Sequence, residues 1–234
     1  EQGRRAAAVM LRMGYDAMAV GNHEFDHGVD VFLGHLKALQ PPALLANALM
    51  SDGGYLPGVH SHKLVEKAGI PILLVGLLTK HTPEMTHAST RDLIWQSPAS
   101  ALTRVRKEAE PAGALVIPMT HLGVEGDRAL ARAHPDLALI VGGHSHTRLE
   151  AGVIEGQTLI VQTGAKATTL GRVDLWLDPD SHAVVRSQSR LIKLLTDPED
   201  LDRNTALEAA CTKLVLASER RMGVVVGSFS APLM

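Results

Sequence analysis

Apolar runs alternate with amphipathic stretches through the first 141 residues of the chain. Runs with the length and composition of buried strands occupy residues 15–20, 43–46, 70–77, 114–119 and 137–141. Apolar residues at helical spacing occupy residues 4–13, 29–39, 99–110 and 126–134. Gly14 and Pro41-Pro42 end the first two helical stretches. Strands that alternate with helices in this way predict an α/β layered domain.

The pattern changes from Thr158 onward, where short strands follow one another closely. Strand-like runs occupy residues 158–163, 171–178 and 183–194. The segment Asp178-Pro179-Asp180-Ser181 has the composition of a hairpin turn. This part of the domain is therefore predicted to be antiparallel.

Loops and a final helix complete the expected layout. Residues 51–62, rich in Gly, Pro and His, predict a loop, and residues 80–97, with scattered His, Thr and Ser, predict a long loop with limited regular structure. Residues 197–223 predict an amphipathic helix, and residues 223–234 predict a further strand. No internal repeat is apparent.

Composition narrows the functional classes. Net charge is −2 and aromatic residues make up 3% of the 234, so neither a basic field nor stacking platforms favour a nucleic-acid polymer as partner. No apolar run approaches the roughly 20 residues of a membrane span. The single cysteine, Cys211, excludes an internal disulfide and a cysteine-rich zinc site. Nothing in the pattern predicts an oligomeric state.

Polar clusters follow three of the apolar strands directly. Gly21-Asn22-His23-Glu24-Phe25-Asp26 follows residues 15–20, Thr120-His121 follows residues 114–119, and Gly142-Gly143-His144-Ser145-His146 follows residues 137–141. Functional crevices in α/β sheets lie at the carboxyl ends of the strands. We therefore expect these clusters to converge, although about 120 residues separate the first from the last.

The side chains in these clusters suit a metal site. Imidazoles and an amide oxygen are ligands for zinc, manganese or iron, which makes Asn22, His121, His144 and His146 candidate ligands. His144 and His146 fit one ion or two neighbouring ions. His23, oriented by Asp26 three residues later, is a candidate either to stabilise the charge that develops at phosphorus or to donate a proton to a leaving alkoxide.

Each cluster also has an ordinary structural explanation. A lone histidine after a strand is often a surface or capping residue, and His-Ser-His alone is a weak motif. A packed run of Asn, His, Glu and Asp at a strand end is costly without a role, and three such ends together favour function. The remaining histidines lie in predicted loops or on helix faces and receive no role: His27, His35, His60, His62, His81, His87, His134 and His182.

The same clusters carry a family resemblance along nearly the whole chain. In order, the chain contains GNHEFDHG, LLANAL, GLLT, MTHLG, GGHSHT and QTG followed by LGRVDLWLD. This series resembles the 5′-nucleotidase branch of the calcineurin-like metallophosphoesterases. The resemblance implies a metallophosphoesterase β-sandwich flanked by helices.

The resemblance also implies roles for individual residues. Asn22, His121 and His144 would bind one divalent ion, and His146 would contribute to a second. His23 and Asp26 would form a catalytic dyad. The implied activity is 5′-nucleotidase-type phosphomonoester hydrolysis by water activated between two metal ions. The implied substrate is a nucleotide or another small phosphoester.

Some family motifs are not found in these 234 residues. The family domain opens with an Asp-x-His strand and a Gly-Asp motif, so we expect residues 1–196 to be a catalytic domain that lacks its first strand or strands. Such a domain would expose an unpaired sheet edge, and the ion at His146 would bind poorly. Residues 197–234 are expected to lead to a C-terminal nucleotide-binding domain. Family members are typically exported to the periplasm or cell surface, with the signal outside this chain.

Other activities on the same fold remain open. They are a 2′,3′-cyclic nucleotide phosphodiesterase, a sugar phosphatase and, least favoured, a thiosulfohydrolase. The alternative from another class is an inactive metal-binding fragment.

Overall fold

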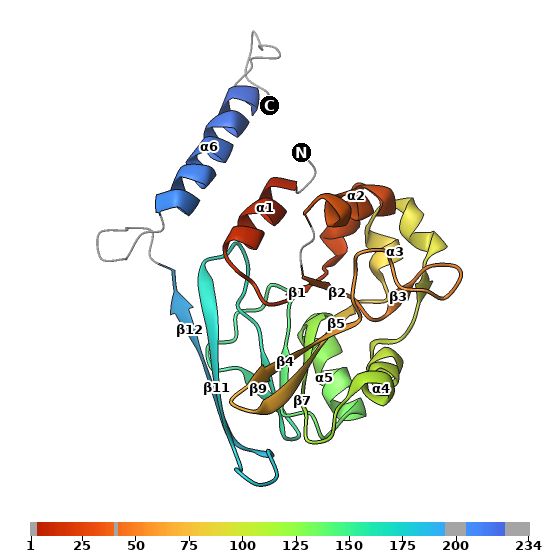
Figure 1. Cartoon of the computed structure of the whole chain (residues 1–234), viewed down its shortest axis with the longest axis vertical. Coiled ribbons are helices and arrows are strands. Elements are labelled where there is room, and N and C mark those ends of the chain that lie inside the picture. The colour runs from red at the N-terminus through yellow and green to blue at the C-terminus, as the bar shows by residue number, and fades with distance from the viewer. Residues whose placement is uncertain (1–3, 40–41, 195–204, 223–234) are drawn as a thin grey trace, which may run out of the picture.

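The computed structural model describes residues 4–39, 42–194 and 205–222, and its centre is a six-stranded sheet (Figure 1). In spatial order the strands are β4 (His62–Lys67), β5 (Ile70–Leu78), β7 (Leu115–His121), β8 (Leu139–Val141), β10 (Thr158–Val161) and β9 (Val153–Glu155). Strands β5, β7, β8 and β10 run parallel to one another, and β4 and β9 are antiparallel strands at the two edges. The parallel strands therefore end at one common edge of the sheet.

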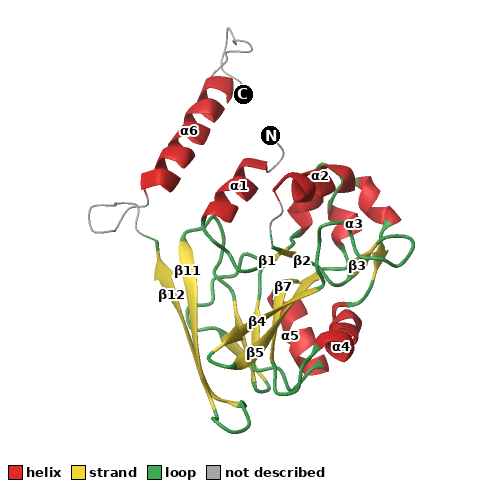
Figure 2. Cartoon of the chain, in the orientation of Figure 1, coloured by secondary structure: helices red, strands yellow, loops and turns green. Residues whose placement is uncertain are grey.

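Two helices, α4 (Pro98–Ala109) and α5 (Val124–Ala133), cover one face of this sheet (Figure 2). Helix α4 begins at Ser97, whose Oγ accepts a hydrogen bond from the amide of Ser100 at 3.1 Å. Leu102 of α4 and Leu130 of α5 are buried against Leu77 of β5. The hydrophobic effect of this core fixes the helices on the sheet.

The opposite face carries a second layer. The parallel pair β1 (Met18–Ala19) and β2 (Ala43–Leu44) lies beside β5, and α2 (Val29–Leu39) packs outside it on a core that includes Phe32. The layers approach closely at Gly76, whose carbonyl accepts from the amide of Ala46 at 2.8 Å. A Cβ at Gly76 would overlap the Leu44 backbone, so a glycine is needed there. The predicted α/β layered architecture is confirmed.

The predicted long loop at residues 80–97 has limited regular structure, as expected. It contains α3 (Thr82–Met85), the 3₁₀ helix η2 (Ala88–Asp92) and β6 (Ile94–Trp95), which pairs with β3 (Ala48–Leu49). Buried threonines organise it: Thr82 Oγ1 donates to the Thr79 carbonyl at 2.7 Å, and Thr90 Oγ1 to that of His87 at 2.8 Å. Because polar contacts hold this segment, hydrophobic periodicity does not reveal it. Strands β4 and β9 were also absent from the predicted pattern.

The predicted hairpin forms from β11 (Thr169–Leu177) and β12 (Val184–Lys193). Its turn is held by Asp178, whose Oδ1 accepts from the amide of Ser181 at 2.8 Å. The hairpin and the β1–β2 pair are separate two-stranded sheets in the described part of the chain; Leu44 of β2 also bridges to His60, and the outer edge of β1 has no strand partner there. Aggregation through such an edge stays a prediction.

The final helix, α6 (Thr205–Met222), packs beside α1 (Arg4–Arg12) (Figure 1). The rest of the predicted segment, residues 197–204 and the strand at residues 223–234, lies outside the described residues. Within the described ranges, no helix is long and apolar enough to cross a bilayer.

Candidate metal centre

Three of the predicted ligands meet at the carboxyl ends of the strands. Asn22 opens the 3₁₀ helix η1 (Asn22–Phe25) after β1, His121 ends β7, and His144 follows β8. Asn22 Oδ1 lies 3.0 Å from His121 Nε2 and 3.3 Å from His144 Nδ1. The two imidazole rings lie 5.0 Å apart between centroids. The structure therefore joins residues that are 99 and 122 positions apart in the chain.

The fourth predicted ligand, His146, lies near this cluster without joining it. Its side chain is exposed, and its charged form lowers the pKa of both His121 and His144. No hydrogen bond or ring contact links His146 to these residues in the part of the chain that the structure describes. Its predicted role at a second ion stays a prediction.

Gln162 holds the loop that carries both histidines of the third cluster. This buried side chain follows β10, and its Oε1 accepts from the Thr147 amide at 2.7 Å and from Ser145 Oγ at 3.0 Å. Its Nε2 donates to the Gly143 carbonyl at 3.1 Å. His144 and His146 have φ values of 81° and 55°, a region that non-glycine residues seldom adopt. Gln162 thus stabilises a strained turn at the site.

Burial keeps the ligand imidazoles neutral. Burial, followed by the charges of His144, His23 and His146, lowers the pKa of His121 to about 4. Burial and neighbouring charges also lower the pKa of His144. At neutral pH, both rings are therefore unprotonated and have a lone pair for a metal ion.

His23 and Asp26 form a pair at the edge of this cluster. His23 Nδ1 lies 2.8 Å from Asp26 Oδ2, and the two side chains are 73% and 42% exposed. The charged form of His23 lowers the pKa of His121 and of His144, so it lies within electrostatic range of both. This geometry suits an imidazole that is held by a carboxylate and is open to a substrate.

Two carboxylates beside the site were missed by sequence reasoning. Glu24 Oε2 accepts from the Gly21 amide at 2.6 Å and closes the turn before Asn22, and burial raises its pKa. A glutamate at the third position of a helix is a capping signal that pointed to this contact. Asp127 is buried in α5 and gave no such signal.

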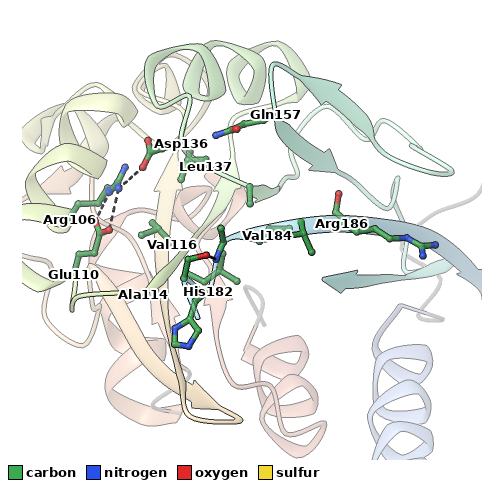
Figure 3. A pocket seen from close by; sticks show the side chains of 17 residues that line it. Arg106, Glu110, Ala114, Val116, Asp136, Leu137, Gln157, His182, Val184 and Arg186 are labelled. Carbon is green, nitrogen blue, oxygen red and sulfur yellow. Dashed lines mark hydrogen bonds and ion pairs between the residues drawn. The ribbon is translucent and has the colours of Figure 1, made fainter. Parts of the chain in front are cut away.

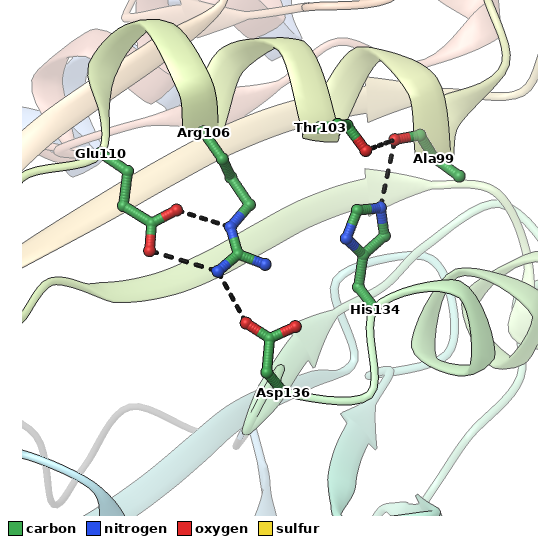
Figure 4. Close-up of polar contacts among 6 residues, drawn as sticks. All are labelled: Ala99, Thr103, Arg106, Glu110, His134 and Asp136. Carbon is green, nitrogen blue, oxygen red and sulfur yellow. Dashed lines mark hydrogen bonds and ion pairs between the residues drawn. The ribbon is translucent and has the colours of Figure 1, made fainter.

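A separate hollow of about 440 Å³ lies at the opposite end of β7 and β8 (Figure 3). Among its lining residues, Arg106 is held between Glu110 and Asp136, with nitrogen–oxygen distances of 2.5 and 2.6 Å. Nearby, His134 Nε2 lies 3.1 Å from the Ala99 carbonyl and joins α5 to α4 (Figure 4). None of the candidate ligands lines this hollow, and its ionic groups serve structural contacts.

The three convergent atoms fit one divalent ion. One amide oxygen and two imidazole nitrogens suit zinc, manganese or iron, and three protein donors leave positions for water or substrate. Among the described residues, no group of three or more His, Cys, Asp and Glu side chains is placed to hold an ion, so the cluster depends on Asn22. Metal binding by these donors stays a prediction, and so does a second ion.

Comparison with known proteins shows the family of the chain. The chain belongs to the calcineurin-like phosphoesterase family, which matches residues 5–148. That range contains Asn22, His121, His144 and His146. The family comprises hydrolases of phosphoester bonds and generally uses divalent metals.

Several relatives are 5′-nucleotidases. The 5′-nucleotidase of Rattus norvegicus is 32% identical over 163 residues, which cover 64% of this chain and 27% of that protein. A 5′-nucleotidase precursor from Thermus thermophilus has a TM-score of 0.81 at 24% identity, covering 97% of this chain and 48% of its own. The sulfate thiohydrolase SoxB of Thermus thermophilus also scores 0.81, at 23% identity, covering 94% of this chain and 40% of its own. These two structures show the fold alone, and the chain spans about a quarter of the length of the curated relatives.

Proposed function

We propose that this chain is the metal-dependent catalytic part of a phosphoester hydrolase, and that its substrates are nucleotides or related small phosphomonoesters. The observation that supports this most is the approach of Asn22 Oδ1 to His121 Nε2 and His144 Nδ1, next to the His23–Asp26 pair. The 5′-nucleotidase relatives favour the nucleotide substrate. Export to the periplasm or cell surface stays a prediction of the resemblance.

The ligand residues prepare the site for an anionic substrate. A divalent ion there would supply Lewis-acid activation of water and neutralise phosphoryl oxygens. Asn22 is an uncharged donor, and His121 and His144 are neutral at neutral pH because burial lowers their pKa. The ligand set therefore leaves the positive charge of the ion available to the phosphate.

His23 is the proposed acid. Asp26 Oδ2 accepts the Nδ1 proton of His23 over 2.8 Å, which fixes the ring and leaves Nε2 to deliver a proton. That proton would go to the leaving alkoxide as the ester bond breaks.

The test compares His23→Ala with His81→Ala in the 234-residue chain, assayed for phosphate release from a nucleoside 5′-monophosphate, whose leaving group is an alkoxide, with added zinc or manganese. His81 is a matched control because it pairs with Glu84 at the same spacing, Nδ1 to Oε1 3.1 Å, and is also exposed. We expect His23→Ala to lower kcat by about 10²- to 10⁴-fold and His81→Ala to leave it unchanged. Unmodified protein without turnover in any metal, or equal effects of the two variants, would refute the proposal. A panel of nucleotides, 2′,3′-cyclic nucleotides and sugar phosphates then tests the substrate class.

A further inference from the structure

Asp127 is a buried carboxylate that has no place in the chemistry proposed above. It lies in α5 and is 0% exposed. Its Oδ1 accepts a hydrogen bond from Thr120 Oγ1 at 2.5 Å, and Thr120 is itself 3% exposed. Its Oδ2 has no hydrogen-bond partner among the described residues. Since buried polar groups are nearly always paired, this oxygen needs an explanation.

The contacts of Asp127 join the two strand ends that carry ligands. Thr120 immediately precedes His121 at the end of β7. On the other side, Oδ2 lies against Gly142, which follows β8 two residues before His144. A Cβ at Gly142 would overlap Oδ2, so only glycine allows the carboxylate this position.

Few backbone connections join β7 directly to β8 at this point, although β7 is paired with β5 and β8 with β10. Strands β7 and β8 pair in register at Met119 and Val141, immediately before Thr120 and Gly142. Beyond that pair, the amide of Gly123 donates to the carbonyl of Gly143 at 3.0 Å. The Asp127 carboxylate fills the space between these two backbone connections.

Burial is energetically unfavourable for the carboxylate of Asp127. Burial raises its pKa to about 7, while the Thr120 hydrogen bond acts in the opposite direction. An apolar side chain of similar volume would avoid this penalty but would not accept the Thr120 hydrogen bond. A carboxylate at position 127 therefore serves the geometry of the strand ends and lowers the stability of the core.

We propose that Asp127 is a positioning residue of the metal centre, which sets the separation of His121 and His144 through Thr120 and Gly142. This inference rests on the proposed function, because the two histidines are ligands only if the site binds metal. It does not make Asp127 a ligand or an acid. Residues that orient ligands in this way typically change metal affinity by 10- to 100-fold when they are altered.

The test uses Thr120→Val, Asp127→Leu and Asp127→Asn in the 234-residue chain. Both of the first two remove the Thr120–Asp127 hydrogen bond: Thr120→Val nearly preserves volume, and Asp127→Leu keeps the number of side-chain heavy atoms. Asp127→Asn keeps an acceptor oxygen for Thr120 and is the conservative variant that should behave like the unmodified chain. Thr158→Val is the matched control, because Thr158 is also 0% exposed and its Oγ1 donates to the Leu137 carbonyl at 2.7 Å. Thr158 begins β10, at the end of the sheet opposite the site.

Three measurements are made on each variant: thermal unfolding, zinc affinity by competition with a chromogenic chelator, and ring ¹⁵N resonances of labelled histidine. We expect Thr120→Val and Asp127→Leu to shift the His121 and His144 resonances and to weaken zinc binding about tenfold or more. We expect Asp127→Asn to restore both, and Thr158→Val to lower only the unfolding temperature.

The outcomes separate this inference from the proposed function. If Thr120→Val and Asp127→Leu affect the two ring resonances no more than Thr158→Val does, Asp127 is a structural residue and the inference is overturned. The ring resonances of metal-free samples are sufficient to decide this point. If the unmodified chain binds no zinc, the proposed function fails, while the ring resonances still show whether Asp127 positions the two histidines.

Discussion

Replacing Gly142 by alanine introduces one methyl group where the structure has no room for it. The new Cβ would overlap Asp127 Oδ2, and would lie 3.2 Å from Asp127 Cγ and 3.4 Å from Gln162 Nε2. Asp127 cannot turn away freely, because it is fully buried and Thr120 holds its other oxygen at 2.5 Å. Relief therefore requires a shift of α5 or loss of that hydrogen bond.

The expected loss of stability follows from these two routes. Overpacking in a dense core costs about 1–3 kcal/mol. Breaking a hydrogen bond to a charged group costs about 1.5–3 kcal/mol. Because either route relieves the overlap, we expect Gly142→Ala to lose about 2–3 kcal/mol in free energy of unfolding. For a domain of this size, that corresponds to a fall of about 4–12 °C in Tm.

Urea unfolding followed by circular dichroism measures this loss. Gly34→Ala is the control, because Gly34 lies in α2 with no atom within 4 Å of its added Cβ. Alanine there should stabilise the helix by about 0.5–1 kcal/mol. A Gly142→Ala protein within about 0.5 kcal/mol of the unmodified chain would refute the reasoning, since that is the scatter of ordinary surface changes. In the double variant with Asp127→Ala, the overlap is absent, so the two losses should not add.

Two further predictions concern the layers and the charge of Asp127. Gly76→Ala should cost about 3 kcal/mol or more, because its Cβ would overlap backbone atoms of Leu44, which cannot rotate away as a side chain can; denaturant unfolding measures it. Burial raises the pKa of Asp127 from 3.8 to about 7, so the folded state retains a proton that the unfolded chain releases. That contribution is complete below pH 3.8 and is lost as pH rises through 7. The stability of the unmodified chain relative to Asp127→Asn should therefore fall by about 2–3 kcal/mol between pH 5 and pH 8, and an unchanged difference would contradict the shift.

The local pattern of apolar and polar residues was sufficient to predict the main elements and the convergence of the polar clusters. The apolar run that became β7 was expected at residues 114–119, and the structure has it at Leu115–His121. Asn22, His121 and His144 were expected together because each follows a strand, and parallel strands end at one edge. These predictions succeeded because hydrophobic burial depends on the local pattern of apolar residues.

The residues that organise the site were not visible in the same way. Gln162 was singled out only as part of the QTG motif, and Asp127 lies in an amphipathic helix, so neither was recognised as a residue that organises the site. Their importance comes from burial beneath strand ends that are distant in the chain. The motif of His146 predicted a ligand, the turn leaves its side chain exposed, and its role stays a prediction.

The sequence by itself thus determined the layered α/β class, the order of most strands and helices, and the chemical types at the strand ends. The tertiary structure decided which of those side chains meet, how close the sheet layers come at Gly76, and which polar groups lose water. The physical reason is that secondary structure depends on periodicity over a few residues. Ligand distances and buried carboxylates depend on packing between segments about 100 residues apart, which no local pattern encodes.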